Sequence, residues 1–162
     1  MYLLNMFFIS SILGHFIENF FYKSKGSGIM YGYWTPIYGI GVVIVIIINH
    51  FISKKKLKPI YHTIYIFFIC ALVLSIIEYI GGFLIELIFH KVFWDYSKES
   101  LNIGKYTSIK MALIWGISST IFLYLIKPLL EILIKKIPKI ITYILSILFL
   151  IDSLFTIYRS FN

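Results

Sequence analysis

Long apolar segments separated by short polar ones are the feature that most constrains what this chain can fold into. Of its 162 residues, 60% are hydrophobic, whereas soluble domains have about 45–50%. A helix needs about 20 residues to cross the hydrocarbon core of a bilayer. On that scale the sequence predicts an all-α, multi-pass transmembrane helix bundle of about five spans, folded as a single domain over residues 1–162. The predicted spans are residues 2–22, 36–52, 60–90, 106–126 and 140–158.

Positive charge lies in short clusters between the apolar segments. The formal net charge is +8, although only 14% of the residues are charged. Each lysine next to anionic headgroups contributes about 1 kcal/mol, so such clusters suit loops at a membrane surface. A nucleic-acid-binding module needs a folded polar domain with a basic face, and the chain has no polar stretch long enough to form one. We therefore expect the lipid bilayer as a partner and no nucleic acid.

Residues 29–41 form an aromatic stretch that is a poor regular helix. They contain three Gly, one Pro and four large aromatic residues, yet they are too apolar for an exposed loop. Irregular backbone at membrane depth is tolerated where protein or a watery cavity satisfies it, which predicts a re-entrant or interfacial turn. A belt of aromatic side chains at the headgroup level fits the same residues equally well.

Residues 127–139 predict a short helix that lies in the membrane interface. Pro128 suits a first helical turn and Pro138 suits a stop. Lys127, Glu131 and Lys135 recur at spacings of four, which allows favourable pairing, and apolar side chains supply the other side. The sequence does not decide between this plain interfacial helix and a coupling helix that docks a cytoplasmic partner.

Basic residues do not settle the orientation of the spans. One orientation places seven of them inside, namely Lys23, Lys25, Lys91, Lys98, Lys105, Lys110 and Arg159. The reverse orientation places eight inside, namely Lys54, Lys55, Lys56, Lys58, Lys127, Lys135, Lys136 and Lys139. The positive-inside rule does not separate seven from eight, so both orientations remain open.

Acidic residues within the predicted spans mark a candidate site. A charge at the bilayer centre costs about 2.5–3.5 kcal/mol on insertion scales, so such residues usually face a bundle interior or a watery cavity. Spacings of three and four place polar residues of the first span on one helix face, namely Ser11, His15, Glu18 and Tyr22. The third span carries a second such stripe, namely Ser75, Glu78, Gly82, Glu86 and His90. We expect the two stripes to face each other across a polar cavity, with Asp152 adding a third wall.

A polar, aromatic segment at residues 91–105 leaves the third span. Trp94 and Tyr96 flank Asp95, which could seat the aromatic rings at the interface while the acid caps a helix or pairs with Lys105. Together with the acids of the spans, this segment supplies the predicted substrate- or ion-binding residues. They are Glu18, Glu78, Glu86, Trp94, Asp95, Tyr96, Asn102 and Lys105.

Three interpretations of these polar residues stay open: hydrogen bonds that fix helix packing, a substrate or ion pathway, and catalysis or metal binding. The last has the least support. Carboxylate and imidazole pairs are present, but they lack the Glu-x-x-His order of di-metal helix bundles. No Ser or Cys stands in a recognisable nucleophile elbow. We therefore predict no catalytic residue, metal ligand or cofactor, and the sequence favours a non-enzymatic role.

Several motifs occur in an order that resembles a known family. They are YGYWTPIYGIG at 31–41, EY at 78–79, WDYS at 94–97, N-x-G-K at 102–105 and KP at 127–128. Over nearly the whole chain they resemble the bacterial CmpB-like family of type IV ABC-transporter permeases. The resemblance implies a small multi-pass protein of the bacterial plasma membrane with a permease-like function and an unknown substrate. Lys105 stands where the family usually has Arg, which keeps the charge but loses a bidentate fork.

The resemblance also implies partners. The sequence contains no Walker A loop of the form G-x-x-x-x-G-K-[ST], so ATP-driven transport requires a separate ATPase subunit. A second copy of the chain is a further expected partner. Two alternatives to a permease remain: a membrane-embedded enzyme acting on lipid or envelope precursors, and a non-catalytic membrane assembly or regulatory protein.

Overall fold

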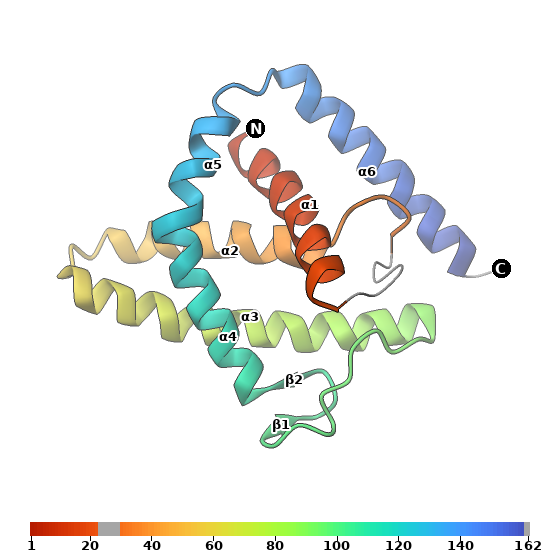
Figure 1. The fold of residues 1–162 in the computed structure, drawn as a ribbon, viewed down its shortest axis with the longest axis horizontal. Coiled ribbons are helices and arrows are strands. Elements are labelled where there is room, and N and C mark those ends of the chain that lie inside the picture. The colour runs from red at the N-terminus through yellow and green to blue at the C-terminus, as the bar shows by residue number, and fades with distance from the viewer. Residues whose placement is uncertain (23–29, 161–162) are drawn as a thin grey trace. The chain divides into compact units, whose positions relative to one another are not determined.

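Helices make up most of the computed structural model, which describes residues 1–22 and 30–160 (Figure 1). Its helices are α1 (Tyr2–Tyr22), α2 (Pro36–Ser53), α3 (Pro59–Phe89), α4 (Ile109–Ile121), the π-helical η1 (Phe122–Ile126), α5 (Lys127–Ile134) and α6 (Lys139–Ser160). Two short strands, β1 (Asn102–Ile103) and β2 (Thr107–Ser108), pair in antiparallel fashion. The prediction of an all-α fold is confirmed, with this small hairpin as the one addition among the described residues.

Five helical stretches within the described residues are long and apolar enough to cross a membrane. They are Tyr2–Phe20, Pro36–Ser53, Pro59–Phe89, Ile109–Ile134 and Lys139–Arg159. Large apolar side chains on these helices are exposed, as Phe68 (64%) and Leu72 (63%) on α3 illustrate. A soluble protein rarely exposes apolar surface so continuously, whereas lipid-facing helices need it. The prediction of about five spans is confirmed.

The third span is one uninterrupted helix of 31 residues, α3. No break occurs at Gly81 or Gly82. The helix ends at His90, whose backbone is left-handed (φ 52°) and whose N–H donates to the Glu86 carbonyl at 2.9 Å. At 1.5 Å per residue α3 is about 46 Å long, which exceeds a hydrocarbon core of about 30 Å.

The fourth span continues through a widened turn into α5 with no intervening loop. In η1 the N–H of Lys127 donates to the Phe122 carbonyl, a π-helical bond over five residues. Proline lacks an N–H and its ring meets the carbonyl four residues earlier, so a widened turn just before Pro128 relieves that conflict. A helix does begin at Lys127 as predicted, but it is not separated from the span before it. Its location at a membrane interface stays a prediction.

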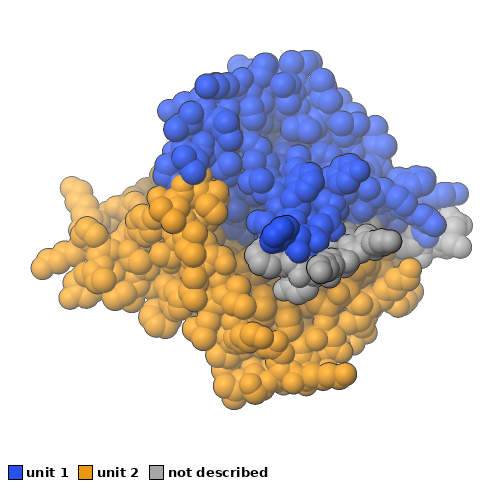
Figure 2. All heavy atoms as spheres, viewed as in Figure 1, with its two compact units in different colours: residues 1–43, 128–162 blue, residues 44–127 orange. Residues whose placement is uncertain are grey.

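The chain forms two compact units, coloured separately in Figure 2. Unit 1 comprises Met1–Val43 and Pro128–Asn162, and unit 2 comprises Ile44–Lys127. Each unit has its own packing. The sequence prediction of a single domain over residues 1–162 stays a prediction.

Unit 1 contains the aromatic turn at residues 30–35. Trp34 is 8% exposed, and its ring makes edge contacts with Phe8 of α1 and Phe149 of α6. The backbone N–H of Thr35 donates to the Ser11 carbonyl at 3.0 Å. The turn is therefore packed against two helices of its own unit, and these contacts bury the aromatic ring of Trp34.

Asp152 of α6 fixes the start of this turn. Its carboxylate accepts the backbone N–H groups of Tyr31 (3.1 Å) and Gly32 (2.8 Å). The hydroxyl of Thr156 donates to the same carboxylate at 3.4 Å. Arg159 adds a hydrogen bond to the Tyr31 hydroxyl. The structure thus gives a backbone-holding role to an acid that the sequence placed on the wall of a polar cavity.

In unit 2, α3 packs against α4. Gly116 of α4 allows close approach, because a Cβ there would lie 2.8 Å from the ring of Phe67. The buried residues of α3 recur at spacings of one to four and are mostly small or apolar, namely Ile66, Cys70, Ala71, Leu74, Ser75, Glu78 and Gly82. Two of them, Glu78 and Gly82, face the segment that follows the helix.

Candidate functional site

The segment between α3 and α4 folds back onto the last turns of α3. Its hairpin pairs Asn102 with Ser108 and Ile103 with Thr107. Gly104 adopts a left-handed backbone (φ 61°), which glycine reaches without the steric cost of a Cβ. Ser108 then caps α4 by accepting the N–H of Met111 at 3.2 Å.

Backbone and indole hydrogen bonds hold the WDYS residues against this hairpin. The N–H of Tyr96 donates to the Lys105 carbonyl at 2.8 Å, and the indole N–H of Trp94 donates to the Tyr106 carbonyl at 3.1 Å. Trp94 and Tyr96 therefore fix the path of the residues that contact α3.

Glu78 is the buried acid of the site, with 3% of its surface exposed. The Thr107 hydroxyl donates to one carboxylate oxygen at 2.7 Å, and the Tyr96 hydroxyl donates to the other at 3.3 Å. A buried acid is costly unless hydrogen-bonded, so these donors account for its presence in an apolar helix.

Glu86 lies two turns further along α3 and forms an ion pair. Lys105 Nζ is 2.6 Å from both carboxylate oxygens, and the Tyr106 hydroxyl donates to Oε2 at 2.8 Å. The two charged side chains are partly exposed, at 30% for Glu86 and 37% for Lys105. The Lys105 ammonium also lies 5.2 Å from the centroid of the Tyr106 ring, within the range of a cation–π contact.

Tyr106 packs its ring on α3 and donates its hydroxyl to Glu86. It is 8% exposed, and its ring makes edge contacts with Tyr79 (5.3 Å) and Phe83 (6.4 Å). A Cβ on Gly82 would lie 2.7 Å from this ring, so the ring occupies the space that the missing side chain leaves.

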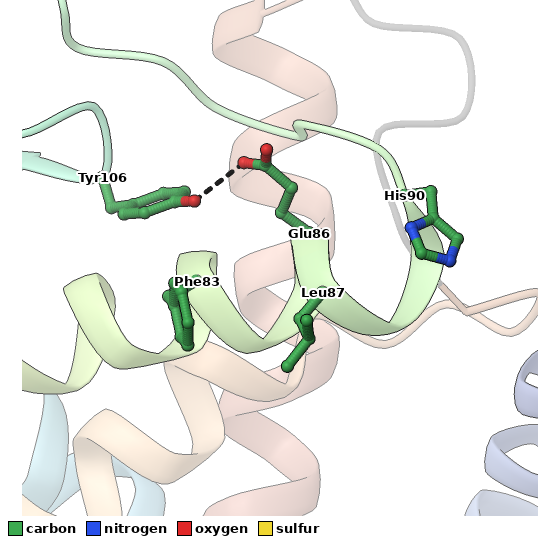
Figure 3. Close-up of a pocket in the computed structure, with 5 residues that line it drawn as sticks. All are labelled: Phe83, Glu86, Leu87, His90 and Tyr106. Atoms are coloured by element: carbon green, nitrogen blue, oxygen red, sulfur yellow. Dashed lines mark hydrogen bonds between the residues drawn. The ribbon is translucent and has the colours of Figure 1, made fainter.

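A pocket of about 360 Å³ opens beside the ion pair (Figure 3). Phe83, Glu86, Leu87 and His90 line it from the end of α3, and Tyr106 lines it from the hairpin. Figure 3 shows the Glu86 carboxylate directed toward the Tyr106 hydroxyl, with Phe83 beneath the tyrosine ring. An apolar floor with a few placed polar groups is the usual form of a small-molecule site, and this volume lies at the lower end of their range.

Asp95 and Asn102 shape the loop and are exposed. Asp95 accepts the backbone N–H of Ser97 at 2.8 Å, which is an Asx turn. The amide of Asn102 donates to the Ser97 carbonyl at 2.7 Å. The pairing of Asp95 with Lys105 that the sequence allowed does not occur, because Lys105 forms its ion pair with Glu86.

Glu18, the remaining candidate, lies on α1 in unit 1 and is half-buried. On the same helix the amide of Asn19 donates to His15 Nε2 at 2.8 Å, so part of the predicted polar stripe has local partners. That Glu18 shares a cavity with Glu78 and Glu86 stays a prediction.

Two residues of the site escaped the sequence analysis, Tyr106 and Thr107. Both are buried and both donate hydroxyls to the acids of α3. Their one signal in the sequence is position, because they follow directly on the N-x-G-K motif at 102–105. Among the described residues, no three His, Cys, Asp or Glu side chains are grouped as metal ligands would be.

The loop side chains have shifted acidities. Hydrogen bonds from Ser97 hold the pKa of Asp95 below its ordinary value. The hydrogen bond to Glu86 raises the pKa of Lys105 above its ordinary 10.5. Burial, followed by the hydrogen bond to Glu86, raises the pKa of Tyr106. The stabilisation from Lys105 is complete below pH 10.5 and is lost as the pH rises through its raised pKa.

Lys105 is expected to react several-fold more slowly than Lys98 with an amine-acylating reagent at about pH 9, because only the neutral amine reacts and a raised pKa keeps it protonated. Peptide mass spectrometry after timed acylation measures both rates. Glu86→Gln should bring the Lys105 rate up to that of Lys98. Equal rates in the unsubstituted protein would show that the ion pair is absent in solution.

The fold and the site together define a class of protein: a multi-pass membrane protein with an ion pair and a pocket at the end of its longest helix. The chain belongs to the family described as Putative ABC-transporter type IV, whose model matches residues 5–157. This confirms the resemblance found in the sequence. No curated protein and no solved structure matches the chain.

Proposed function

We propose that this protein is the permease-like membrane component of a bacterial plasma-membrane ABC transporter, and that the pocket beside Glu86 and Lys105 contacts its substrate. The observation that carries the proposal is the partly exposed ion pair that Lys105 forms with Glu86, a residue of the pocket lining. Family membership supports a transporter component, and five apolar helices support a multi-pass membrane protein. Movement of substrate is then driven by a separate ATPase subunit.

The ion pair supports substrate contact because a substrate anion can replace one of its two members. A partly exposed pair contributes little net stability, since water solvates the separated charges well. A substrate carboxylate or phosphate can therefore replace Glu86 on Lys105 without a large loss to the protein. The Tyr106 hydroxyl then remains as a donor at the same place. Polar residues in a membrane protein that meet at a cavity are functional candidates by default.

Glu78, two turns before Glu86 on α3, supports the same proposal. It binds the hairpin to α3 through Thr107 and the WDYS residues through Tyr96. Its two hydrogen bonds come from the segment that carries Lys105, so any movement of that segment changes the environment of both acids. A closing element beside a pocket is a common feature of proteins that move or sequester substrates.

Purification in a mild detergent tests the transporter assignment. We expect a subunit with a Walker A loop to co-purify, and the reconstituted complex to hydrolyse ATP. Mass spectrometry of small molecules that co-purify should show a compound that the Lys105→Gln variant retains at about one-tenth or less of the wild-type amount, because the variant lacks the charge that pairs with the substrate.

Lys110→Gln is the matched control. It removes the Lys110–Glu99 pair (2.8 Å), which lies in the same region of the chain. Neither member of this pair lines the pocket, whereas Glu86, the partner of Lys105, does. Its retained compounds should equal those of wild type. If no ATPase subunit co-purifies, the transporter assignment fails; if Lys110→Gln and Lys105→Gln lose the same compound equally, the pocket assignment fails.

A further inference from the structure

Four lysines crowd the short connection between α2 and α3. Lys54, Lys55, Lys56 and Lys58 are all exposed. Neither of the two ion pairs found among the described residues includes any of them. We call these four residues the lysine corner. Its charge is therefore available to a partner outside the chain.

A hydrogen-bond chain fixes the helix ends that carry the lysine corner. His62 of α3 contacts Ser53 of α2 through Nε2 (3.3 Å) and Tyr124 of η1 through Nδ1 (3.1 Å). Tyr124 is also bonded to Thr63 at 2.8 Å, and Thr63 donates to the Pro59 carbonyl at 3.0 Å.

One arrangement of protons satisfies every member of this chain. Because the Thr63 hydroxyl donates to Pro59, its oxygen accepts from Tyr124. The Tyr124 oxygen then accepts from Nδ1–H of His62, and Nε2 accepts from the Ser53 hydroxyl. The corner is therefore held in place before any partner binds, which lowers the entropy cost of binding.

Large apolar side chains surround the lysine corner. Phe51 (62% exposed), Ile60 (63%) and Tyr61 (54%) lie on the helix turns next to it. The Lys54 ammonium lies 5.3 Å from the centroid of the Phe51 ring. Basic groups beside exposed aromatic and aliphatic side chains match the boundary between headgroups and acyl chains.

The other end of α3 has a different charge pattern. There Lys105 pairs with Glu86, and Lys110 pairs with Glu99. Pairing offsets the attraction of these two lysines for anionic headgroups. The two orientations carried seven and eight basic residues, which did not decide between them. Of the seven basic residues that the first orientation places inside, Lys105 and Lys110 are neutralised by ion pairs, whereas the four lysines of the lysine corner are not.

We infer that the lysine corner binds the phosphate groups of anionic phospholipids on the cytoplasmic leaflet, which places the Glu86 pocket at the opposite face of the membrane. Positive lysines attract negative phosphate groups, and each lysine near the surface raises the affinity for the lipid about fivefold. The length of α3, about 46 Å, suffices to separate its two ends across a bilayer. The inference does not depend on transport.

Lipid binding by the purified full chain tests the headgroup contact. We expect titration with phosphatidylglycerol to give affinity at least about 25-fold higher than with phosphatidylcholine, and Lys55→Gln/Lys56→Gln to reduce that preference about 25-fold, since each lysine contributes about fivefold. The matched control Lys91→Gln/Lys98→Gln changes the same number of exposed lysines at the other end of α3 and should leave the preference intact. Equal losses in the two variants overturn the inference, as does competition by inorganic phosphate at the lipid concentration.

Cysteine labelling in intact bacterial cells tests the orientation. In a Cys70→Ala background, Lys98→Cys should react with a membrane-impermeant maleimide, and Lys55→Cys should react only after the cells are permeabilised. Cys70 is buried, so replacing it removes background labelling without exposing a new site. The reverse pattern of labelling overturns the inference even if the purified protein prefers phosphatidylglycerol.

Discussion

Gly82→Ala is expected to lower the free energy of unfolding relative to Gly81→Ala by about 1–3 kcal/mol, although the two residues are neighbours on one helix. A Cβ on Gly82 would lie 2.7 Å from Cδ1 and 3.1 Å from Cβ of Tyr106, which is buried. A Cβ on Gly81 would meet no heavy atom within 4 Å. Both substitutions gain the same helix propensity, about 0.5–1 kcal/mol, so the difference between them measures the overpacking alone.

Unfolding in mixed detergent micelles measures this difference. Gly81→Ala should be more stable than wild type, because only the propensity gain applies to it. In the Gly82→Ala variant, the amine-acylating reagent should also react faster with Lys105. A displaced Tyr106 no longer contacts Glu86 or the Lys105 ammonium. Equal stabilities for the two variants would mean that Tyr106 does not pack on Gly82.

Thr107→Val is expected to cost about 1–2 kcal/mol of stability, more than the average of about 0.6 kcal/mol for a hydrogen bond between membrane helices. The substitution removes the hydroxyl that donates to Glu78 at 2.7 Å and keeps the side-chain shape. Thr107 is 2% exposed and Glu78 is 3% exposed, so water does not replace the lost donor. Tyr96→Phe removes the longer bond of 3.3 Å at a half-buried site and should cost less than about 0.5 kcal/mol.

A double-mutant cycle separates this bond from other effects of the substitution. In a Glu78→Gln background, Thr107→Val should cost less than it does in wild type, because a neutral amide oxygen replaces the carboxylate as the acceptor. Thr107→Ser keeps the hydroxyl and should recover most of the stability. An unchanged cost in the Glu78→Gln background would assign the effect to packing of the methyl groups.

The spans were predictable because each is a long apolar run whose length matches a bilayer. The acids of α3 were predictable as a site for a related reason: a carboxylate within such a run is costly unless something compensates it. Glu78 and Glu86 are in fact hydrogen-bonded by the segment that the WDYS motif opens. The sequence did not show which side chains donate hydrogen bonds to these two acids.

The partner of Lys105 shows why the donors were not predictable. Asp95 is nearer in sequence, but the backbone N–H of Ser97 satisfies it locally, without closing a longer loop. Lys105 therefore forms its ion pair with Glu86, which lies 19 residues earlier in the chain. That choice depends on the register of the hairpin, which is set by left-handed backbone at Leu101 (φ 59°) and Gly104 (φ 61°). Composition and periodicity contain no information on this register, and a leucine in the left-handed conformation of Leu101 is unusual.

The hold of Asp152 on the aromatic turn has a consequence for biosynthesis. The N–H groups of Tyr31 and Gly32 find their acceptor 121 and 120 residues later in the chain. At about 5–20 residues per second, a ribosome takes roughly 6–24 s to reach it. During that interval the turn has none of its carboxylate hydrogen bonds, so the nascent protein completes unit 1 only when its last helix leaves the ribosome.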